Sequence, residues 1–479
     1  MDNVEKQINS SFKWSTVTEI VVKLISPILN AILARILLPE DFAPLTTITM
    51  IVSFCEVFIE SGFKKVLIQR DLGPKEEQEY FDVAFWASLS ISLLIWGGIA
   101  GTSKLLAQLL KSPNLWIAII ISGIILPMYS VVGIFGAKIQ KKLLFKKLFW
   151  VRMITALIPL VVTIPLALLG LSYWALIVGN IASVFAQMVV ICAISHHRVR
   201  IYFSFNILKD ICSNGIWTML DGVAVWFTAW IDSLLIATYM SDYYLGLYKN
   251  SLSTVTSLFG IVSAAVIPVL FVGLSKYQHD HQKFSNFFNN TQRRLALILI
   301  PLGVGVCIYS DVAVSILFGN QWKEAAGVVG ITALTVAVRT VFVSINNDAF
   351  RAKARFKLPL FLQVSDNIVL IPLCVFSARR GFWMLVYMRA IARLFLIVPE
   401  MIIMRKVLHI DVVDQIKKLI PIFISTLIMA IACTGLRCVS HSFIWSMVSV
   451  ALAIAIYMVS LMIFPSSRED LKEFIRMRR

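Results

Sequence analysis

The chain has 479 residues, of which 58% are hydrophobic and 15% are charged, and its mean hydropathy is +0.82. Ordinary soluble domains carry about 25% charged residues, so this composition excludes a set of soluble domains. The net charge of +17 comes from Lys and Arg in short connections between apolar segments. This placement is typical of the cytoplasmic loops of a membrane protein and speaks against a nucleic-acid partner.

Apolar segments recur along the whole chain and predict an all-α integral membrane protein. A helix needs about 20 apolar residues to cross the hydrocarbon core, and loop residues separate segments of roughly this size. The first residues have no short apolar core followed by a cleavage site, so no removable signal peptide is expected. About 14 transmembrane helices are predicted, at residues 13–37, 43–69, 81–109, 114–137, 150–170, 173–195, 214–240, 249–275, 294–318, 325–350, 356–377, 382–404, 418–436 and 442–464.

The basic residues indicate how the chain is oriented in the membrane. Every second connection is rich in Lys and Arg, as at residues 138–147 and 351–357, whereas the intervening connections hold few. Because short cytoplasmic loops collect Lys and Arg, both termini are predicted to lie in the cytoplasm. The external connections are short, so none of them accommodates a catalytic or receptor domain.

Two similar turns indicate an internal duplication. PEDFAPL at residues 39–45 follows the first predicted span, and DYYLGLY at residues 242–248 follows the seventh. Each is an acidic, aromatic turn that leads into the next span, at the place expected for a repeat of six spans. The predicted domains are an N-terminal lobe at 1–200, a C-terminal lobe at 201–410, and two appended helices with a basic cytoplasmic tail at 411–479.

Several predicted spans carry polar residues at helical spacing. In the first span Glu19, Lys23, Ser26 and Asn30 are three or four residues apart, which places them on one face. Ionisable groups in hydrocarbon normally face a bundle interior or a water-filled cavity, so a central cavity is predicted. The similar faces of four other spans hold Thr49, Ser53, Glu56 and Glu60; Asp221, Thr228 and Asp232; Thr332, Thr335, Arg339 and Asn346; and Arg389, Arg393 and Glu400.

The basic members of these faces predict a site for a phosphorylated substrate. Lys23, Arg339 and Arg393 each lie about 15 Å into their spans, and Arg389 lies somewhat nearer the outside. Arg holds phosphate through bidentate hydrogen bonds, and Lys acts as a compact point charge. We therefore expect these four residues to attract a pyrophosphate headgroup in the cavity, with Asn30 beside them.

Acidic residues are at least as numerous in these spans, and two interpretations of them stay open. In one they couple transport to Na⁺ or H⁺, and Glu56 and Glu60, one turn apart, share a proton or hold Na⁺. In the other they pair with bases and join helices, as Glu19 would with Lys23. The candidate ion-coupling or cavity acids are Glu19, Glu56, Glu60, Asp221 and Asp232, and further acids in the spans are Asp348, Asp366 and Glu400.

The sequence contains no motif of a common enzyme. It has no G-x-x-x-x-G-K-[ST], no H-E-x-x-H and no G-x-S-x-G, which speaks against ATP hydrolysis and two classes of hydrolase. The seven cysteines are scattered without C-x-x-C spacing, so neither a metal nor a redox site is expected. We predict a protein that is not an enzyme and that has no cofactor apart from a coupling ion.

A set of short motifs resembles a known family. ARILLPEDF at 34–42, FIESGF at 58–63 and LIQR at 67–70 are followed by LALLG at 166–170, YWAL at 173–176, WIDSLLI at 230–236, LGLY at 245–248 and LFGNQW at 317–322. In order and spacing they resemble the polysaccharide-exporting branch of the multidrug/oligosaccharidyl-lipid/polysaccharide (MOP) superfamily. The resemblance covers about the first 350 residues of the chain.

The resemblance implies an O-antigen-type flippase in a bacterial inner membrane. Such a protein has two pseudo-symmetric six-helix lobes around a V-shaped central cavity, and it moves an undecaprenyl-pyrophosphate-linked oligosaccharide outward by alternating access for lipopolysaccharide, capsule or exopolysaccharide assembly. Its partners are the lipid-linked oligosaccharide, membrane lipid, and a polysaccharide polymerase with other assembly proteins. The alternatives are a cation-coupled drug antiporter, with Asp232 as a cation ligand, and a non-transporting envelope-assembly scaffold; the short loops disfavour a membrane glycosyltransferase.

Overall fold

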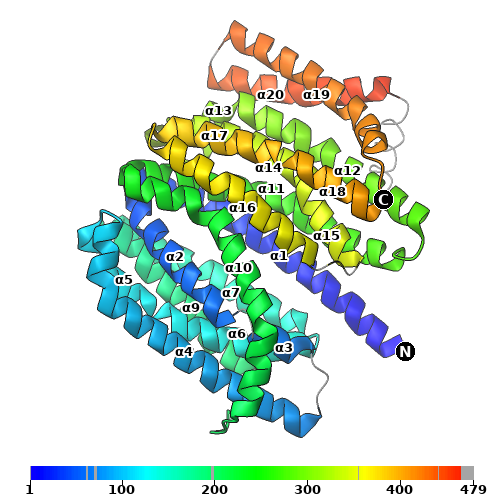
Figure 1. The fold of residues 1–479 in the computed structure, drawn as a ribbon. Coiled ribbons are helices and arrows are strands. Elements are labelled where there is room, and N and C mark those ends of the chain that lie inside the picture. Colours follow the sequence, from blue (N-terminus) through cyan, green and yellow to red (C-terminus); the bar gives the residue numbers. More distant parts are fainter. Residues whose placement is uncertain are drawn as a thin grey trace. The chain divides into compact units, whose positions relative to one another are not determined.

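The computed structural model describes residues 2–60, 63–69, 73–195, 199–353, 355, 357–440 and 442–464. Its regular structure within these ranges is helical, without a strand, which confirms the predicted all-α class (Figure 1). The chain divides into two compact units, unit 1 at Met1–Asn250 and unit 2 at Ser251–Arg479. The predicted basic tail lies after residue 464, outside the described residues.

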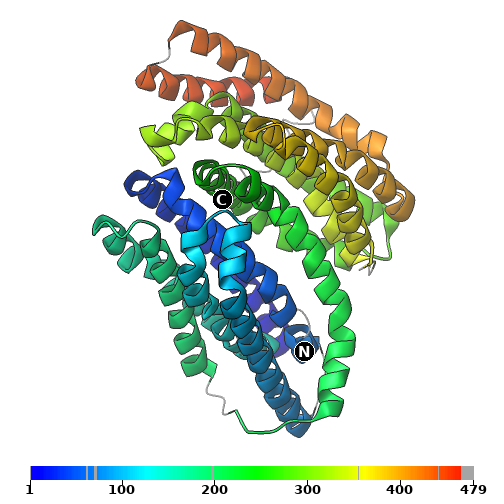
Figure 2. The same cartoon turned by 60° about the vertical axis from the view of Figure 1, so that its left-hand side comes forward.

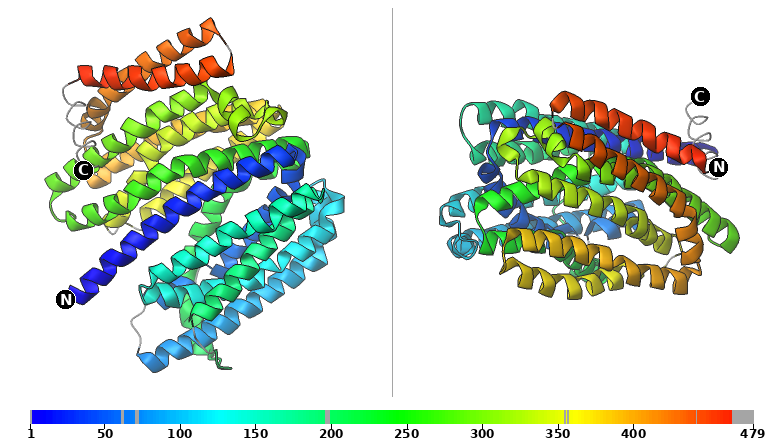
Figure 3. Two further views of the ribbon diagram at one scale, coloured as in Figure 1. Left: turned by 180° about the vertical axis from the view of Figure 1, so that it is seen from behind. Right: turned by 90° about the horizontal axis from the view of Figure 1, so that it is seen from above.

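Unit 1 is a bundle of mostly long helices. Figure 3 shows α1 as one continuous helix. The long helix α10 packs against α2, α3 and α4 (Figure 2). The elements of unit 1 are α1 (Asp2–Ile36), α2 (Pro39–Glu60), α3 (Phe63–Gln69), α4 (Pro74–Leu109), η1 (Pro113–Leu115), α5 (Trp116–Gly123), α6 (Ile125–Lys141), α7 (Phe145–Val161), α8 (Thr163–Leu168), α9 (Tyr173–Ser195), α10 (Phe205–Tyr239) and the start of α11 (Asp242–Lys276).

Unit 2 holds the end of α11 and the remaining helices. Side chains cap the starts of its last two helices: Asp411 accepts a hydrogen bond from the backbone N–H of Val413, and Ser442 accepts one from the backbone N–H of Trp445. The elements of unit 2 are α12 (His281–Ile308), α13 (Ser310–Leu317), η2 (Asn320–Trp322), α14 (Ala325–Arg339), the π-helical turn η3 (Thr340–Ser344), α15 (Ile345–Ala352), α16 (Lys357–Ala378), α17 (Phe382–Phe395), α18 (Ile397–Leu408), α19 (Val412–Val439) and α20 (Phe443–Ile463). α19 and α20 lie side by side (Figure 3).

Thirteen of the described helical segments are long and apolar enough to cross a membrane. The chain is therefore a multi-pass membrane protein. The predicted span at 249–275 coincides with α11, which is not among the thirteen; only described residues were considered there, so the count of about 14 stays a prediction. Several predicted spans are interrupted helices, with breaks at Ile124, Val162 and Leu396.

Close contacts within unit 1 join segments that were assigned to different predicted lobes. A Cβ on Gly222 of α10 would lie 2.8 Å from Val57 Cγ1 of α2, so the glycine permits this approach. A Cβ on Gly246 of α11 would lie 1.7 Å from the carbonyl oxygen of Pro39, the first residue of α2. The two similar segments, predicted as turns, are the first turns of α2 and α11, and they contact each other. The predicted lobe boundary at residue 200 describes a repeat rather than a contact grouping, and it stays a prediction.

Candidate transport site

The polar face of α1 contains an ion pair that the sequence did not indicate. Glu19 pairs with Arg152 of α7, and both side chains are about half exposed. The sequence suggested Lys23, on the same helix, as the partner of Glu19. Lys23 and Asn30 are both partly buried on α1, and they lie one turn beyond Glu19 and Ser26, respectively. Their role in headgroup binding stays a prediction.

The polar face of α2 lies partly against α10. Trp226 of α10 donates a hydrogen bond from Nε1 to Ser53 Oγ at 3.1 Å. Glu56 on α2 and Asp221 on α10 are partly buried. The side chain of Glu60 lies outside the described residues, so the predicted sharing of a proton or Na⁺ by Glu56 and Glu60 remains a prediction.

Asp232 of α10 is fully buried and well supplied with hydrogen-bond donors. Tyr248 of α11, itself buried, donates from Oη to Asp232 Oδ2 at 2.6 Å. The backbone N–H and the hydroxyl of Ser233 donate to Oδ1 at 2.7 and 3.3 Å. Donors on both oxygens stabilise a buried carboxylate without any bound ion. The geometry therefore favours a structural role for Asp232 over that of an open cation ligand.

Unit 2 brings two of the predicted basic residues together. Arg339, at the end of α14, donates from Nη1 to the backbone carbonyl of Arg393 on α17 at 3.0 Å. Its Nη2 lies 3.6 Å from Oδ2 of Asp366 on α16, and both side chains of this ion pair are largely buried. Arg389, one turn before Arg393, is only 7% exposed. We call the residues that α14, α16 and α17 contribute here the arginine cluster. They are Arg339, Asp366, Arg389 and Arg393.

Glu400 of α18 belongs to the surroundings of this cluster. It is 3% exposed, and it interacts electrostatically with both Arg339 and Asp366. The sequence showed Asp366 and Glu400 as acids inside predicted spans, but nothing in their spacing indicated that they share one arginine. Only the packing of α14, α16, α17 and α18 brings them together.

A π-helical turn follows Arg339 directly. Such turns leave backbone carbonyls without their usual α-helical partners and occur often at functional sites. Gln292 of α12 donates to the carbonyl of Val341 at 3.2 Å, and Asn346 donates to the carbonyl of Phe342. Two buried amides therefore support the turn that positions Arg339.

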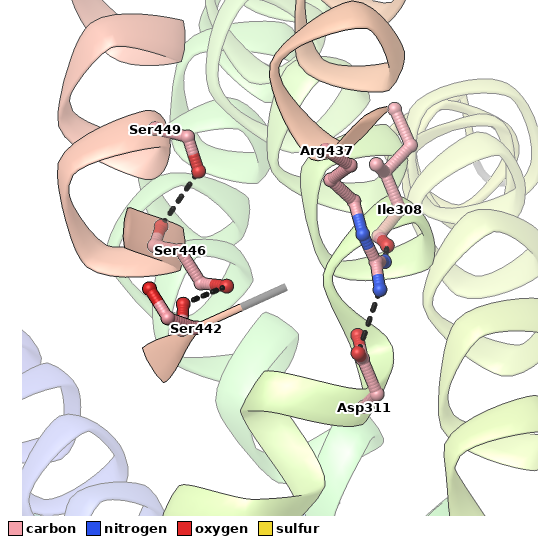
Figure 4. Close-up of polar contacts among 6 residues, drawn as sticks. All are labelled: Ile308, Asp311, Arg437, Ser442, Ser446 and Ser449. Carbon is pink, nitrogen blue, oxygen red and sulfur yellow. Dashed lines mark hydrogen bonds and ion pairs between the residues drawn. The ribbon is translucent and has the colours of Figure 1, made fainter. Parts of the chain in front are cut away.

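An apolar cavity lies elsewhere in unit 2, between α12, α13, α19 and α20. Its volume is about 510 Å³. At one end Arg437 of α19 pairs with Asp311 of α13 at 2.6 Å and donates to the carbonyl of Ile308 (Figure 4). At the other end Tyr457 of α20 donates to the carbonyl of Leu297 at 2.8 Å. These polar contacts hold the appended helices against α12 and α13.

The predicted site residues fall into two groups. Lys23, Asn30, Glu19, Glu56, Asp221 and Asp232 belong to unit 1, whereas Arg339, Arg389 and Arg393 belong to unit 2. Within unit 2 Arg339 pairs with Asp366 and contacts the backbone of Arg393, and the role of the three arginines in substrate binding stays a prediction. A common headgroup site formed by Lys23 and the arginines stays a prediction.

The fold is similar to that of two solved membrane transporters. The solved structure of the lipid II flippase MurJ, in an inward closed conformation, matches with a TM-score of 0.78 at 15% identity and covers 94% of this chain and 98% of that chain. An inward-facing multidrug resistance MATE family transporter of the MOP superfamily matches with a TM-score of 0.64 at 12% identity, over 82% of this chain and 98% of that chain. At these identities the likeness shows the fold alone.

The family follows from the sequence match. The model of the family described as polysaccharide biosynthesis protein matches residues 32–327, which is more than half of the chain, so the chain belongs to this family. The succinoglycan biosynthesis transport protein ExoT of Rhizobium meliloti is 24% identical over 335 residues, 70% of this chain and 67% of that protein. The resemblance to the polysaccharide-exporting branch of the MOP superfamily is thereby confirmed. These similar proteins are named as transporters and flippases rather than enzymes.

Proposed function

We propose that this protein flips an undecaprenyl-pyrophosphate-linked oligosaccharide repeat unit across the bacterial inner membrane by alternating access. The product feeds the assembly of O-antigen, capsule or exopolysaccharide. Both termini face the cytoplasm, and a polysaccharide polymerase takes over the flipped repeat unit. The protein acts as a transporter without a bound cofactor, driven by a coupling ion.

This proposal rests on one observation, which is that the family of the chain and the fold of the chain both agree with a flippase for lipid-linked sugars. The chain belongs to a polysaccharide biosynthesis family, and its fold matches that of a lipid II flippase over 94% of its length. A lipid-linked sugar combines an apolar tail with a charged pyrophosphate. The arginine cluster supports this substrate, because guanidinium groups in a partly dry environment bind phosphate oxygens strongly.

The decisive test is reconstitution in liposomes with a fluorescent undecaprenyl-pyrophosphate-linked oligosaccharide. A membrane-impermeant quencher reports how much of this probe has changed leaflet. The purified protein should accelerate the exchange, and joint substitution of Lys23, Arg339, Arg389 and Arg393 by Gln should abolish it. As a matched control, Arg351→Gln and Arg380→Gln remove exposed arginines and should leave the exchange intact. Retained exchange after the fourfold substitution contradicts the predicted headgroup site.

The MATE-like fold also supports the antiporter alternative. If deletion of the protein changes drug tolerance but leaves surface polysaccharide unchanged, the antiporter replaces the flippase. If neither phenotype changes and no probe moves in liposomes, the scaffold interpretation replaces both.

A further inference from the structure

Glu400 is a buried membrane acid with an oxygen that lacks a hydrogen-bond partner. The residue is 3% exposed, and its Oε2 contacts no donor among the described residues. Removing a lone carboxylate from water costs several kcal/mol unless a cation or donors compensate. The protonated carboxyl, which is neutral, avoids this cost.

The nearby cation is already engaged elsewhere. Arg339 acts electrostatically on Glu400, but its two terminal nitrogens are directed to Asp366 and to the carbonyl of Arg393. Two carboxyl groups therefore compete for one guanidinium. In the structure Asp366 holds it, and Arg393 also acts electrostatically on Asp366.

The charged groups that act electrostatically on Glu400 are Arg339 and Asp366. α17 contributes Arg393, and α19 contributes the neutral Gln415, whose Nε2 lies 4.0 Å from Sδ of Met404, one turn beyond Glu400. The charged residues at this end of α19 are Asp414, Lys417 and Lys418, and Asp414 pairs with Lys418 at 2.8 Å. The charge state of Glu400 is therefore tied to the position of Arg339.

The backbone next to Arg339 is suited to a change of position. The π-helical turn Thr340–Ser344 packs against both α12 and α18. π-helical turns interrupt the regular hydrogen-bond pattern of an α-helix and are frequent at functional sites. Gln292 and Asn346 supply side-chain donors that keep the carbonyls of this turn satisfied.

The cluster is better suited to a proton than to a metal ion. Among the residues that the structure describes, no three His, Cys, Asp or Glu side chains converge so as to hold a metal. A hard cation needs several oxygen ligands, whereas here Asp366 is already paired with the guanidinium of Arg339. A proton needs only one carboxyl oxygen.

We propose that Glu400 binds and releases the proton that couples transport to a proton gradient, and that Arg339 moves from Asp366 to Glu400 when that proton leaves. On release the O–H bond of the carboxyl breaks, the proton passes to water, and the carboxylate that remains pairs with Arg339. On uptake the reverse occurs, and Arg339 returns to Asp366. This inference rests on the proposed transport function, and it names the coupling ion and its site.

Infrared spectroscopy tests the proton site without any substrate. The protein is reconstituted in vesicles of phosphatidylethanolamine and phosphatidylglycerol, and the C=O band of protonated carboxyl groups is followed while the pH is raised. The wild type should show such a band at neutral pH, and Glu400→Gln should lose it. Glu324→Gln, which changes an exposed glutamate, should keep it. Glu400→Asp should shift the band, which keeps the test valid if the Gln variant does not fold.

A band that persists in Glu400→Gln, or that disappears in Asp366→Asn, overturns the assignment of the proton to Glu400. The Gln side chain matches the protonated acid in size and charge, so a monodisperse elution profile is expected for the variant.

Transport of the fluorescent undecaprenyl-pyrophosphate probe under imposed gradients tests the coupling. With one proton per cycle, each unit of pH difference should change the ratio of probe between the leaflets about tenfold. In Glu400→Gln the ratio should no longer respond to the pH gradient, and a Na⁺ gradient should have no effect on either protein. A wild type that responds to Na⁺ alone overturns the proton inference and leaves the proposed function intact. A wild type that moves no probe contradicts the proposed function, and the infrared result then stands by itself.

Discussion

Asp232 and Glu400 are both buried membrane acids, yet their surroundings differ. Asp232, in unit 1, receives hydrogen bonds on both oxygens from Tyr248 and Ser233. Glu400, in unit 2, has an oxygen without a donor and competes with Asp366 for Arg339. A carboxylate whose donors are fixed has one stable state, whereas one that competes for a cation has two. The difference separates an acid that holds helices together from one suited to switching.

The largest expected effect comes from removing the shared cation. Arg339→Gln leaves Asp366 buried without its ion-pair partner, so we expect a loss of about 3–5 kcal/mol in the free energy of unfolding. Thermal unfolding in detergent measures this loss. Arg351→Gln removes a half-exposed guanidinium that pairs with Asp348 at 3.7 Å, so it should cost less, about 1 kcal/mol. Equal losses of unfolding free energy in the two variants would show that the arginine cluster stabilises the fold no more than the pair of Arg351 and Asp348 does.

A smaller effect is expected where the start of α11, which contains Tyr248, meets α2. In Gly246→Ala the new Cβ would lie 1.7 Å from the Pro39 carbonyl oxygen, so the backbone must move and Tyr248 with it. We expect a loss of about 3 kcal/mol in unfolding free energy, at the upper end for overpacking. Gly101→Ala, where nothing lies within 4 Å, is the matched control and should be neutral or stabilising. The comparison fails if both glycines tolerate alanine.

Removing one donor from Asp232 sharpens the comparison further. Tyr248→Phe keeps the ring and deletes the hydrogen bond to Oδ2, so a loss of about 1.5–3 kcal/mol is expected in thermal unfolding. Tyr239→Phe changes an exposed tyrosine on α10 and should have almost no effect. If Tyr248→Phe does not change the stability, the hydrogen bond from Tyr248 does not fix Asp232, and the contrast between Asp232 and Glu400 fails.

The smallest effect concerns Asp242, which is the first residue of α11 and lies outside the predicted spans. Partial burial raises the pKa of the Asp242 carboxyl above its usual range, and the negative charge of Glu40 raises it further. A hydrogen bond from Ser112 lowers this pKa but does not cancel the increase. Because the pKa is raised in the folded state, the charged form destabilises the fold. Unfolding temperature should therefore rise as the pH falls through this pKa, and it should decline toward neutral pH.

Asp242→Asn should remove this part of the pH dependence and stabilise the protein at neutral pH by less than about 1 kcal/mol, since surface charges are screened. Thermal unfolding between acidic and neutral pH measures both effects. An unchanged pH profile in Asp242→Asn would assign the dependence to another group.

The sequence by itself determined the class of the protein and the residues that bear charge within its helices. Hydrophobic length identified nearly all of the spans, because a helix that crosses hydrocarbon must satisfy its own backbone and cover itself with apolar side chains. Helical spacing placed Glu19, Lys23 and Asn30 along one helix, since that relation depends only on the local repeat.

Only the tertiary structure decided which charges meet. Glu19 pairs with Arg152 rather than with Lys23, and Arg339 pairs with Asp366. These partners lie on different helices, and no local rule relates them. The breaks at Ile124, Val162 and Leu396 and the π-helical turn after Arg339 likewise depend on neighbouring helices that supply the missing contacts. Packing therefore made Asp232 a satisfied acid and Glu400 a competing one, although both appear in the sequence as a single acid within an apolar helix.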